Sequence, residues 1–170
     1  MSKRVAYLEP PGTYSEAAAL KYDNTANLIP FPSITASVEA VRVGRAEEGV
    51  IPIENSLEGS VNDTLDLLIH ETVLHIRREL VLPIDHCFLV APGTKPSQVE
   101  IVYSHPQALG QCRYFLQDSY PNVHVVASLS TVAAVEQMLA SEQVAAAIAP
   151  RRASELYAVE VLTDGIQDQP

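Results

Sequence analysis

The sequence predicts an α/β fold made of two lobes with mainly parallel strands. Strand-like and helix-like segments alternate almost throughout the chain, which is the pattern of α/β proteins. The alternation breaks at Pro83 and then starts again, so we expect one lobe over residues 1–82, a second over residues 83–170, and a cleft between them. Hydrophobic residues make up 47% of the 170 positions, which is enough to bury a core.

Local signals place the elements of the first lobe. Thr13 as N-cap and Glu16 three residues later form a capping box, which predicts a helix ending near Tyr22. A second helix over residues 33–43 is closed by Gly44. Strands are expected over residues 4–8, 28–31 and 49–53, and a third helix over residues 62–71.

The second lobe follows a β-rich passage over residues 73–90 that is broken at Pro83. We expect the helix over residues 106–117 to pack on a sheet, because its apolar residues recur at helical spacing. That apolar stripe consists of Ala108, Leu109, Cys112, Phe115 and Leu116. Further strands are expected over residues 101–103, 123–126, 144–148 and 159–162, with helices over residues 131–140 and from residue 151.

Charge and composition exclude several functions. The net charge of −10, with scattered cations, argues against a nucleic-acid partner. No secretory signal and no apolar run of about 18 residues is present, so no membrane partner is expected. Cys87 and Cys112 lie in apolar surroundings and fit free thiols in a reducing compartment. These observations predict a cytoplasmic globular protein.

Nucleotide and metal motifs are also excluded. The sequence contains no glycine-rich phosphate loop, nucleophile elbow or paired-cysteine motif. His70 and His75 look like part of a zinc helix, but they are five residues apart. Residues at that spacing lie about 140° apart around a helix, so they cannot bind one metal ion from the same face. No metal site is predicted.

Three polar segments, at residues 10–16, 51–60 and 103–112, each connect a strand to a helix. Taken singly, they also fit a plain helix cap, a polar turn and an N-cap at Ser104. Gln107 and Gln111 favour a ligand site, because they lie four residues apart on one helix face. Ligands of open α/β sheets bind beyond the carboxyl ends of strands, and helix N-termini attract anions. The segments together predict a small, anionic ligand held by dipoles, hydroxyls and amides.

The same segments resemble the prephenate dehydratase family. The resemblance is carried by YLEPPGTYSE at residues 7–16, GVIPIENS at residues 49–56 and SHPQALGQC at residues 104–112, with support at residues 166–168. It covers essentially the whole chain. It implies two lobes like those of type II periplasmic binding proteins, with the active site in the cleft. It also implies the conversion of prephenate to phenylpyruvate, with loss of carbon dioxide and water and without a cofactor.

The resemblance implies roles for particular residues at matching positions. Asn55, Ser104 and Gln111 would bind and orient the substrate, and Thr13 and Ser15 would line the first-lobe side of the cleft. Three further candidates have less defined roles. Glu54 is interpreted as a structural hydrogen-bond acceptor, His105 as either structural or functional, and Gln107 as a second amide beside Gln111.

The chain departs from the family pattern in two ways. Glu9 stands where family members usually have glycine. The family's Thr-Arg-Phe motif, whose threonine is regarded as the catalytic hydroxyl, would lie beyond Pro170, so no catalytic residue is assigned. The expectation is therefore a truncated catalytic domain, without a regulatory ACT domain, that folds but turns over poorly.

Two other functions stay open at this point. Arogenate dehydratase performs the same elimination on an amino-acid substrate, and no residue of the sequence separates the two. A catalytically inactive module that binds a small carboxylate would also use these polar segments. Homodimers are common in the family, although the sequence itself does not reveal an oligomeric state.

Overall fold

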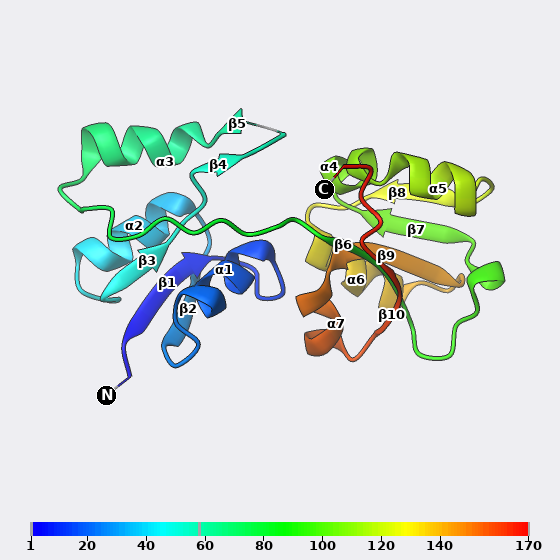
Figure 1. Ribbon diagram of the computed structural model, residues 1–170. Coiled ribbons are helices and arrows are strands. Elements are labelled where there is room, and N and C mark those ends of the chain that lie inside the picture. Colours follow the sequence, from blue (N-terminus) through cyan, green and yellow to red (C-terminus); the bar gives the residue numbers. More distant parts are fainter. Residues whose placement is uncertain (1, 58, 170) are drawn as a thin grey trace. The chain divides into compact units, whose positions relative to one another are not determined.

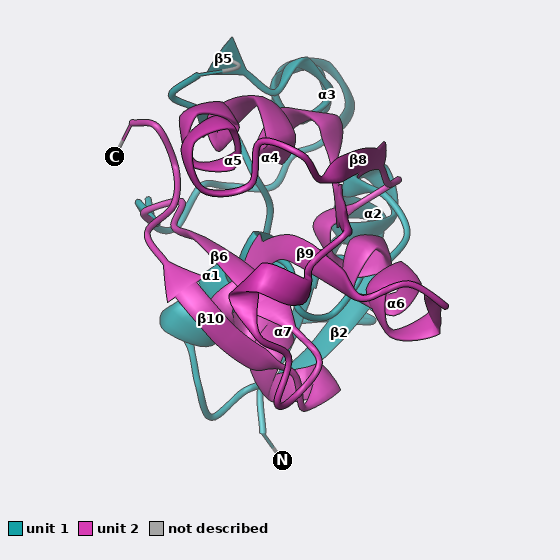
Figure 2. Cartoon of the chain, turned by 90° about the vertical axis from the view of Figure 1, so that its right-hand side faces the viewer, with its two compact units in different colours: residues 1–82 teal, residues 83–170 magenta. Residues whose placement is uncertain are grey.

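The computed structural model describes residues 2–57 and 59–169. The chain forms two compact units, Met1–Leu82 and Pro83–Pro170, each with its own β-sheet (Figures 1 and 2). Glu58, which belongs to the polar segment at residues 51–60, lies outside the described residues. Helices and strands alternate in both units, which confirms the predicted α/β class.

The first unit contains a parallel sheet in the order β2-β1-β3. Its elements are β1 (Arg4–Leu8), α1 (Tyr14–Tyr22), β2 (Asn27–Phe31), α2 (Ile34–Arg42) and β3 (Glu48–Val50). Parallel pairing places Ala6 of β1 opposite Ile29 of β2 and Gly49 of β3. Helix α2 covers the face of the sheet on which Ala6 packs, together with Phe31 and Ala40.

Beyond β3, a short hairpin precedes a helix. The hairpin strands are β4 (Glu54–Asn55) and β5 (Gly59–Ser60), which pair antiparallel. Helix α3 (Asn62–Asp66) continues into a π-helical turn, η1 (Leu67–Glu71), so the two together span the helix predicted over residues 62–71.

Two predictions for the first unit were wrong. Strand β3 ends at Val50 rather than at residue 53, because Pro52 interrupts the backbone pattern that a parallel ladder needs. Residues 73–82 form no strand, although their composition is β-rich. Val73, Ile76 and Val81 are 86%, 69% and 75% exposed, and the segment pairs with no strand among the described residues. A strand needs a neighbouring strand, and composition alone does not supply one.

The second unit contains a five-stranded mixed sheet in the order β10-β6-β9-β7-β8. Strand β7 is parallel to β8 and β9, whereas β6 is antiparallel to β9 and β10. The strands are β6 (His86–Val90), β7 (Ile101–Ser104), β8 (His124–Ala127), β9 (Ala145–Pro150) and β10 (Glu160–Asp164). The helices are the 3₁₀ turn η2 (Pro96–Gln98), α4 (Pro106–Gln111), α5 (Arg113–Ser119), α6 (Thr131–Ala140) and α7 (Arg151–Tyr157).

Both faces of this sheet are buried. Figure 1 shows α4 and α5 on one side of the sheet, and α6 and α7 on the other. Side chains of β6 alternate between the two, because successive residues of a strand point to opposite faces. Phe88 and Val90 pack with Cys112 under α4 and α5, while Cys87 and Leu89 pack with Val135 of α6.

The helix predicted over residues 106–117 is divided at Cys112. Cys112 has φ −114° and ψ 23°, outside the helical region, and it serves as the C-cap of α4 and the N-cap of α5. Its side chain is nevertheless fully buried, and Ala108 and Leu116 of the predicted apolar stripe are only 3% and 8% exposed. The stripe was therefore predicted correctly, and the break lies within it.

Candidate functional site

The turn between β1 and α1 is built around Gly12 and Glu16. Gly12 has φ +89°, a conformation that glycine adopts without strain. Its N–H donates to the Glu16 carboxylate at 2.8 Å, and that carboxylate is only 8% exposed. An acidic side chain in the first turn also interacts favourably with the positive end of the helix dipole. The turn that carries Thr13 and Ser15 is thus fixed by a buried acid.

Thr13 does not act as the capping acceptor that the sequence suggested. It is the N-cap residue by position, with extended backbone, but its side chain accepts no capping hydrogen bond. Its hydroxyl instead donates to the carbonyl of Pro10 at 2.8 Å, which closes the turn from the other side. Ser15 lies in the first turn of α1 and is half-buried.

Asn55 and Glu54 form strand β4 of the short hairpin. The side-chain Oδ1 of Asn55 accepts from the N–H of Leu57 at 2.9 Å, which orients the carboxamide. Asn55 is half-buried, whereas Glu54 is exposed. The carboxamide of Asn55 is therefore held by the backbone of its own hairpin.

The segment leading into this hairpin is anchored from α3. Thr64 is fully buried, and its hydroxyl donates to the carbonyl of Pro52 at 2.6 Å. The N–H of Val61 donates to the carbonyl of Ile53 at 2.9 Å. The carbonyls of Pro52 and Ile53 are thus both held just before the hairpin, and this support was not predicted from the sequence.

In the second unit, Ser104 ends β7 and is fully buried. Its hydroxyl donates to the carbonyl of Ile148 in β9 at 2.6 Å. The N-cap of α4 is the next residue, His105, whose Nδ1 accepts from the N–H of Gln107 at 3.3 Å. Ser104 therefore joins two strands, and the alternative of Ser104 as N-cap was wrong by one residue.

Gln111 lies at the end of α4 and contacts a histidine that sequence reasoning did not single out. The Oε1 atom of Gln111 is 2.7 Å from Nε2 of His86, the first residue of β6. Gln107 is half-buried one turn earlier on the same helix. His86 is only 3% exposed, and burial lowers its pKa, although the Gln111 hydrogen bond and the nearby Asp85 partly oppose this effect. The ring is therefore neutral at neutral pH.

The backbone of His86 is held by the segment at residues 166–168. The N–H of His86 donates to Oε1 of Gln167 at 3.0 Å, and its carbonyl accepts from the N–H of Ile166 at 3.1 Å. The N–H of Asp168 donates to the carbonyl of Gln111 at 2.6 Å. One short segment thus connects the histidine and the glutamine. A sequence signal existed, since an ionisable residue that opens an apolar strand needs a buried partner.

Cys112 lies in the same motif but is not suited to nucleophilic chemistry. Burial raises the pKa of its thiol to about 12, so the thiol stays protonated at neutral pH. Cys87 and Cys112 are both buried free thiols, as predicted.

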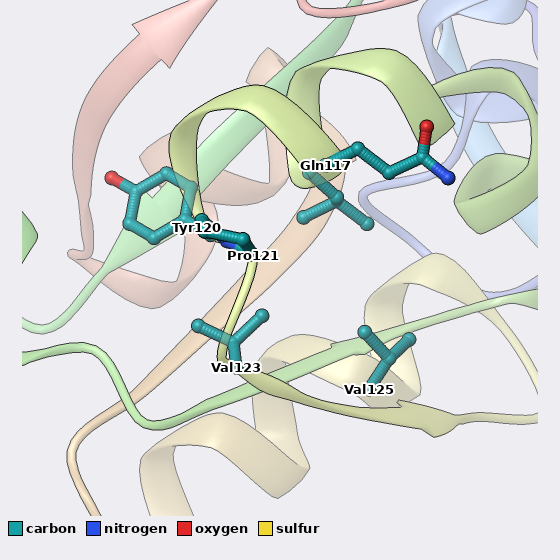
Figure 3. Close-up of a pocket in the computed structure, with 6 residues that line it drawn as sticks. Gln117, Tyr120, Pro121, Val123 and Val125 are labelled. Carbon is teal, nitrogen blue, oxygen red and sulfur yellow. The ribbon is translucent and has the colours of Figure 1, made fainter.

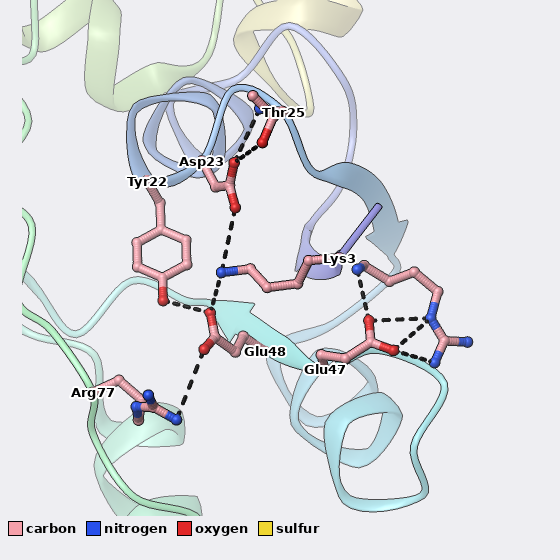
Figure 4. Close-up of polar contacts among 8 residues, drawn as sticks. Lys3, Tyr22, Asp23, Thr25, Glu47, Glu48 and Arg77 are labelled. Carbon is pink, nitrogen blue, oxygen red and sulfur yellow. Dashed lines mark hydrogen bonds and ion pairs between the residues drawn. The ribbon is translucent and has the colours of Figure 1, made fainter. Parts of the chain in front are cut away.

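Several cations of the first unit pair with carboxylates outside the motif segments. Lys3 lies 2.7 Å from Glu48 and 3.3 Å from Asp23, and Arg77 lies 3.9 Å from Glu48 (Figure 4). The motif segments at residues 10–16, 51–60 and 103–112 contain no lysine or arginine. Hydrogen-bond donors there must come from hydroxyls, amides and backbone N–H groups.

A small surface pocket does not coincide with these residues. Its volume is about 200 Å³, and Figure 3 shows it at the end of α5 beside β8. The lining residues are Leu116, Gln117, Tyr120, Pro121, Val123 and Val125, none of which is a predicted site residue. We therefore do not assign the site to it.

Two further findings on the described residues concern metal sites and membrane-spanning helices. Across residues 2–57 and 59–169, no group of three or more histidine, cysteine, aspartate or glutamate side chains is arranged to hold a metal ion. Among the same residues, no helix has both the length and the apolar character needed to cross a membrane.

Comparison with known proteins identifies the family. The sequence profile described as "Prephenate dehydratase" matches residues 5–170. The chain is 42% identical over 166 residues to "Arogenate dehydratase 5, chloroplastic" of Arabidopsis thaliana, covering 97% of the chain and 39% of that protein. It is also 42% identical over 168 residues to "Bifunctional chorismate mutase/prephenate dehydratase" of Stutzerimonas stutzeri, covering 98% of the chain and 46% of that protein.

A solved structure supports the same assignment. The crystal structure of prephenate dehydratase from Arthrobacter aurescens in complex with L-Phe aligns with a TM-score of 0.86 and 33% identity. The alignment covers 98% of this chain and 56% of that one. The match covers 39% and 46% of the length of the two curated relatives named above, so the chain spans less than half of each. With the match over residues 5–170 and the shared fold, the chain belongs to the prephenate dehydratase family.

Proposed function

We propose that the protein is a prephenate dehydratase that converts prephenate to phenylpyruvate in phenylalanine biosynthesis. The observation that carries the proposal is the family match over residues 5–170. In this reaction the ring carboxylate leaves as carbon dioxide, the ring hydroxyl takes up a proton and leaves as water, and the ring becomes aromatic. The protein contributes by holding the carboxylates and by placing a proton donor near the leaving hydroxyl.

The arrangement of the motif residues supports substrate binding. Gln111 is an amide whose Oε1 is held by His86, so its NH₂ group is directed away from the histidine, where it can donate to a carboxylate. The Oδ1 atom of Asn55 accepts from the N–H of Leu57, which fixes the orientation of that carboxamide. We propose that Thr13, Ser15, Asn55, Ser104 and Gln111 form the substrate site, with Glu54, His105 and Gln107 as further candidates.

Within this set, Ser104 is proposed to act through its position rather than its hydroxyl. Its hydroxyl donates to Ile148, and the side chain is fully buried. Replacing it with alanine would leave the Ile148 carbonyl without that donor and shift the end of β7, from which His105 and α4 begin. We therefore expect Ser104 to set the position of the α4 N-terminus.

The test is product formation from two substrates in parallel. Phenylpyruvate formation from prephenate is measured at neutral pH against an enzyme-free blank, because prephenate also decomposes unaided. Phenylalanine formation from arogenate is measured beside it. We expect prephenate turnover above the blank and faster than arogenate turnover.

Other outcomes of this assay point to the other candidates. Preferential turnover of arogenate would assign the function that the name of the Arabidopsis relative states. Binding of prephenate with no turnover of either compound would favour a module that binds a small carboxylate.

We also propose a cytoplasmic location and a homodimeric state. The low cysteine content and the two buried free thiols support a reducing compartment. Membership of the prephenate dehydratase family, in which homodimers are common, supports the homodimer. Analytical ultracentrifugation should then give a mass of about twice the 18.5 kDa of one chain. A single species at the mass of one chain would contradict the dimer.

A further inference from the structure

The contact between His86 and Gln111 joins the start of β6 to the end of α4. His86 is 3% exposed and belongs to none of the polar motif segments, yet its ring lies 2.7 Å from the side chain of a proposed substrate-binding residue. The histidine backbone cannot shift freely, because Gln167 and Ile166 bond its N–H and its carbonyl. The ring is thus a fixed partner for the Gln111 carboxamide.

The chemistry of this contact determines which end of the amide is left for a ligand. A neutral imidazole has one N–H donor and one bare nitrogen acceptor. If Nε2 carries the hydrogen, it donates to Oε1 of Gln111, and the amide NH₂ group faces away from the histidine. If Nε2 is bare, the amide is reversed, and a carbonyl oxygen faces away instead. The observed geometry has Oε1 of Gln111 toward Nε2.

For an anionic ligand it matters which end of the Gln111 amide faces away from His86. The motif segments contain no lysine or arginine, so each donor counts. An outward amide NH₂ attracts a carboxylate oxygen, whereas an outward carbonyl oxygen repels it. The histidine tautomer therefore decides whether Gln111 favours or opposes the ligand.

We propose that His86 is a positioning residue: it donates Nε2–H to Oε1 of Gln111 and so presents the Gln111 NH₂ group to a carboxylate of the substrate. This proposal rests on the proposed function, in which Gln111 contacts prephenate. His86 itself does not touch the substrate.

The first test is prephenate binding by five variants of the chain, measured by calorimetry. His86→Leu removes the donor, and we expect binding about tenfold weaker. His86→Gln keeps an N–H donor near the position of Nε2, and we expect binding within about twofold of wild type. Gln111→Leu removes the ligand contact, and His86→Leu added to it should weaken binding no further. His124→Leu, an exposed histidine on β8, is the matched control and should leave binding unchanged.

Two results of the binding series would overturn the proposal. One is wild-type affinity in a folded His86→Leu variant. The other is a double variant whose loss equals the sum of the two single losses, since additive effects mean that the residues act separately. A merely structural role would lower stability in the His86→Leu variant and leave the affinity of the folded fraction unchanged.

The second test reads the tautomer directly and does not depend on any ligand. A long-range ¹H–¹⁵N correlation spectrum of the wild-type chain, with His86 assigned by its absence in His86→Gln, reports which ring nitrogen carries hydrogen. We expect Nε2–H at neutral pH, and a hydrogen on Nδ1 alone would overturn the proposal even if His86→Leu fails to fold. Failure of the wild-type chain to bind prephenate would contradict the proposed function and the positioning role together. The tautomer measurement needs no ligand, so it would still report whether His86 carries a hydrogen on Nε2. A failure of the proposed function can therefore be told apart from a failure of the hydrogen bond that His86 is proposed to donate.

Discussion

Glu16 illustrates how a single residue supports the first motif. Its carboxylate is nearly buried and accepts from the N–H of Gly12, whose positive φ shapes the turn before α1. The sequence correctly marked Glu16 as a first-turn acid but assigned the capping role to Thr13, whose hydroxyl donates to Pro10 instead. The direction of a hydroxyl depends on backbone geometry that the residue types alone do not determine.

Removing the Glu16 acceptor is expected to destabilise the fold. Glu16→Ala leaves the buried Gly12 N–H without its partner, which costs about 1–3 kcal/mol. Glu16→Gln keeps a side-chain oxygen and should cost less. Glu39→Ala on the exposed face of α2 is the control and should change stability by less than about 1 kcal/mol. Urea denaturation measures all three, and equal losses for Glu16→Ala and Glu39→Ala would contradict this role.

His86 predicts a pH dependence of stability. Burial lowers the pKa of His86 in the folded state. In the unfolded chain the pKa of the histidine is about 6.5, so the unfolded chain binds a proton more readily. Protonation of the unfolded state therefore lowers stability as pH falls below that value, and the contribution is constant above it. We expect the free energy of unfolding to fall more steeply between pH 7 and pH 5.5 in wild type than in His86→Gln. Identical slopes of unfolding free energy against pH in the two proteins would contradict a lowered pKa of His86 as the cause.

At the scale of elements, local signals predicted helices better than strands. The helix predicted over residues 33–43 is present as α2, and Ser33 is its N-cap, with its Oγ accepting from the N–H of Ala36 at 3.0 Å. The β-rich passage over residues 73–82 forms no strand. The prediction was wrong there because strand pairing depends on a distant partner that residue types do not reveal. The contact between His86 and Gln111 was missed for a related reason, since 25 residues separate the two in the chain.

The cap at Ser33 gives a prediction for α2. Ser33→Ala removes the acceptor for the Ala36 N–H and should lower stability by about 1 kcal/mol. Ser33→Asp keeps an acceptor at the same position and should retain most of the stability. Ser56→Ala in the exposed hairpin loop serves as the control. Thermal unfolding distinguishes these variants, and a loss for Ser56→Ala as large as that for Ser33→Ala would count against the cap.

The close packing of α2 on β3 gives a second prediction at this scale. A Cβ added at Gly49 would lie 3.3 Å from Cγ2 of Val41 and 3.8 Å from the carbonyl oxygen of Ala6. Gly49→Ala should therefore destabilise the first unit by about 1 kcal/mol or more. Val41→Ala removes the crowding atom, so Gly49→Ala should cost less in that background. Urea denaturation of the four-member cycle measures the coupling, and strictly additive losses would exclude this contact as the cause.

At the scale of the whole molecule, the sequence predicted the α/β class, most elements and the family. These follow from alternating segments, helix caps and three motif stretches, all of which are local. The contacts that hold the motif segments in place could not be predicted from such local signals. Thr64 holds Pro52, and residues 166–168 hold both His86 and Gln111, through contacts between segments far apart in the chain.

The most direct test of the account is calorimetric binding of prephenate to the wild-type chain, to Gln111→Leu and to Gln117→Leu. Gln117 is an exposed glutamine of α5 and provides the same substitution outside the motif. We predict that wild type and Gln117→Leu bind prephenate equally and that folded Gln111→Leu binds at least about tenfold more weakly. Equal binding by all three proteins, or no binding by the wild-type chain, would contradict the assignment of Gln111 to a prephenate site.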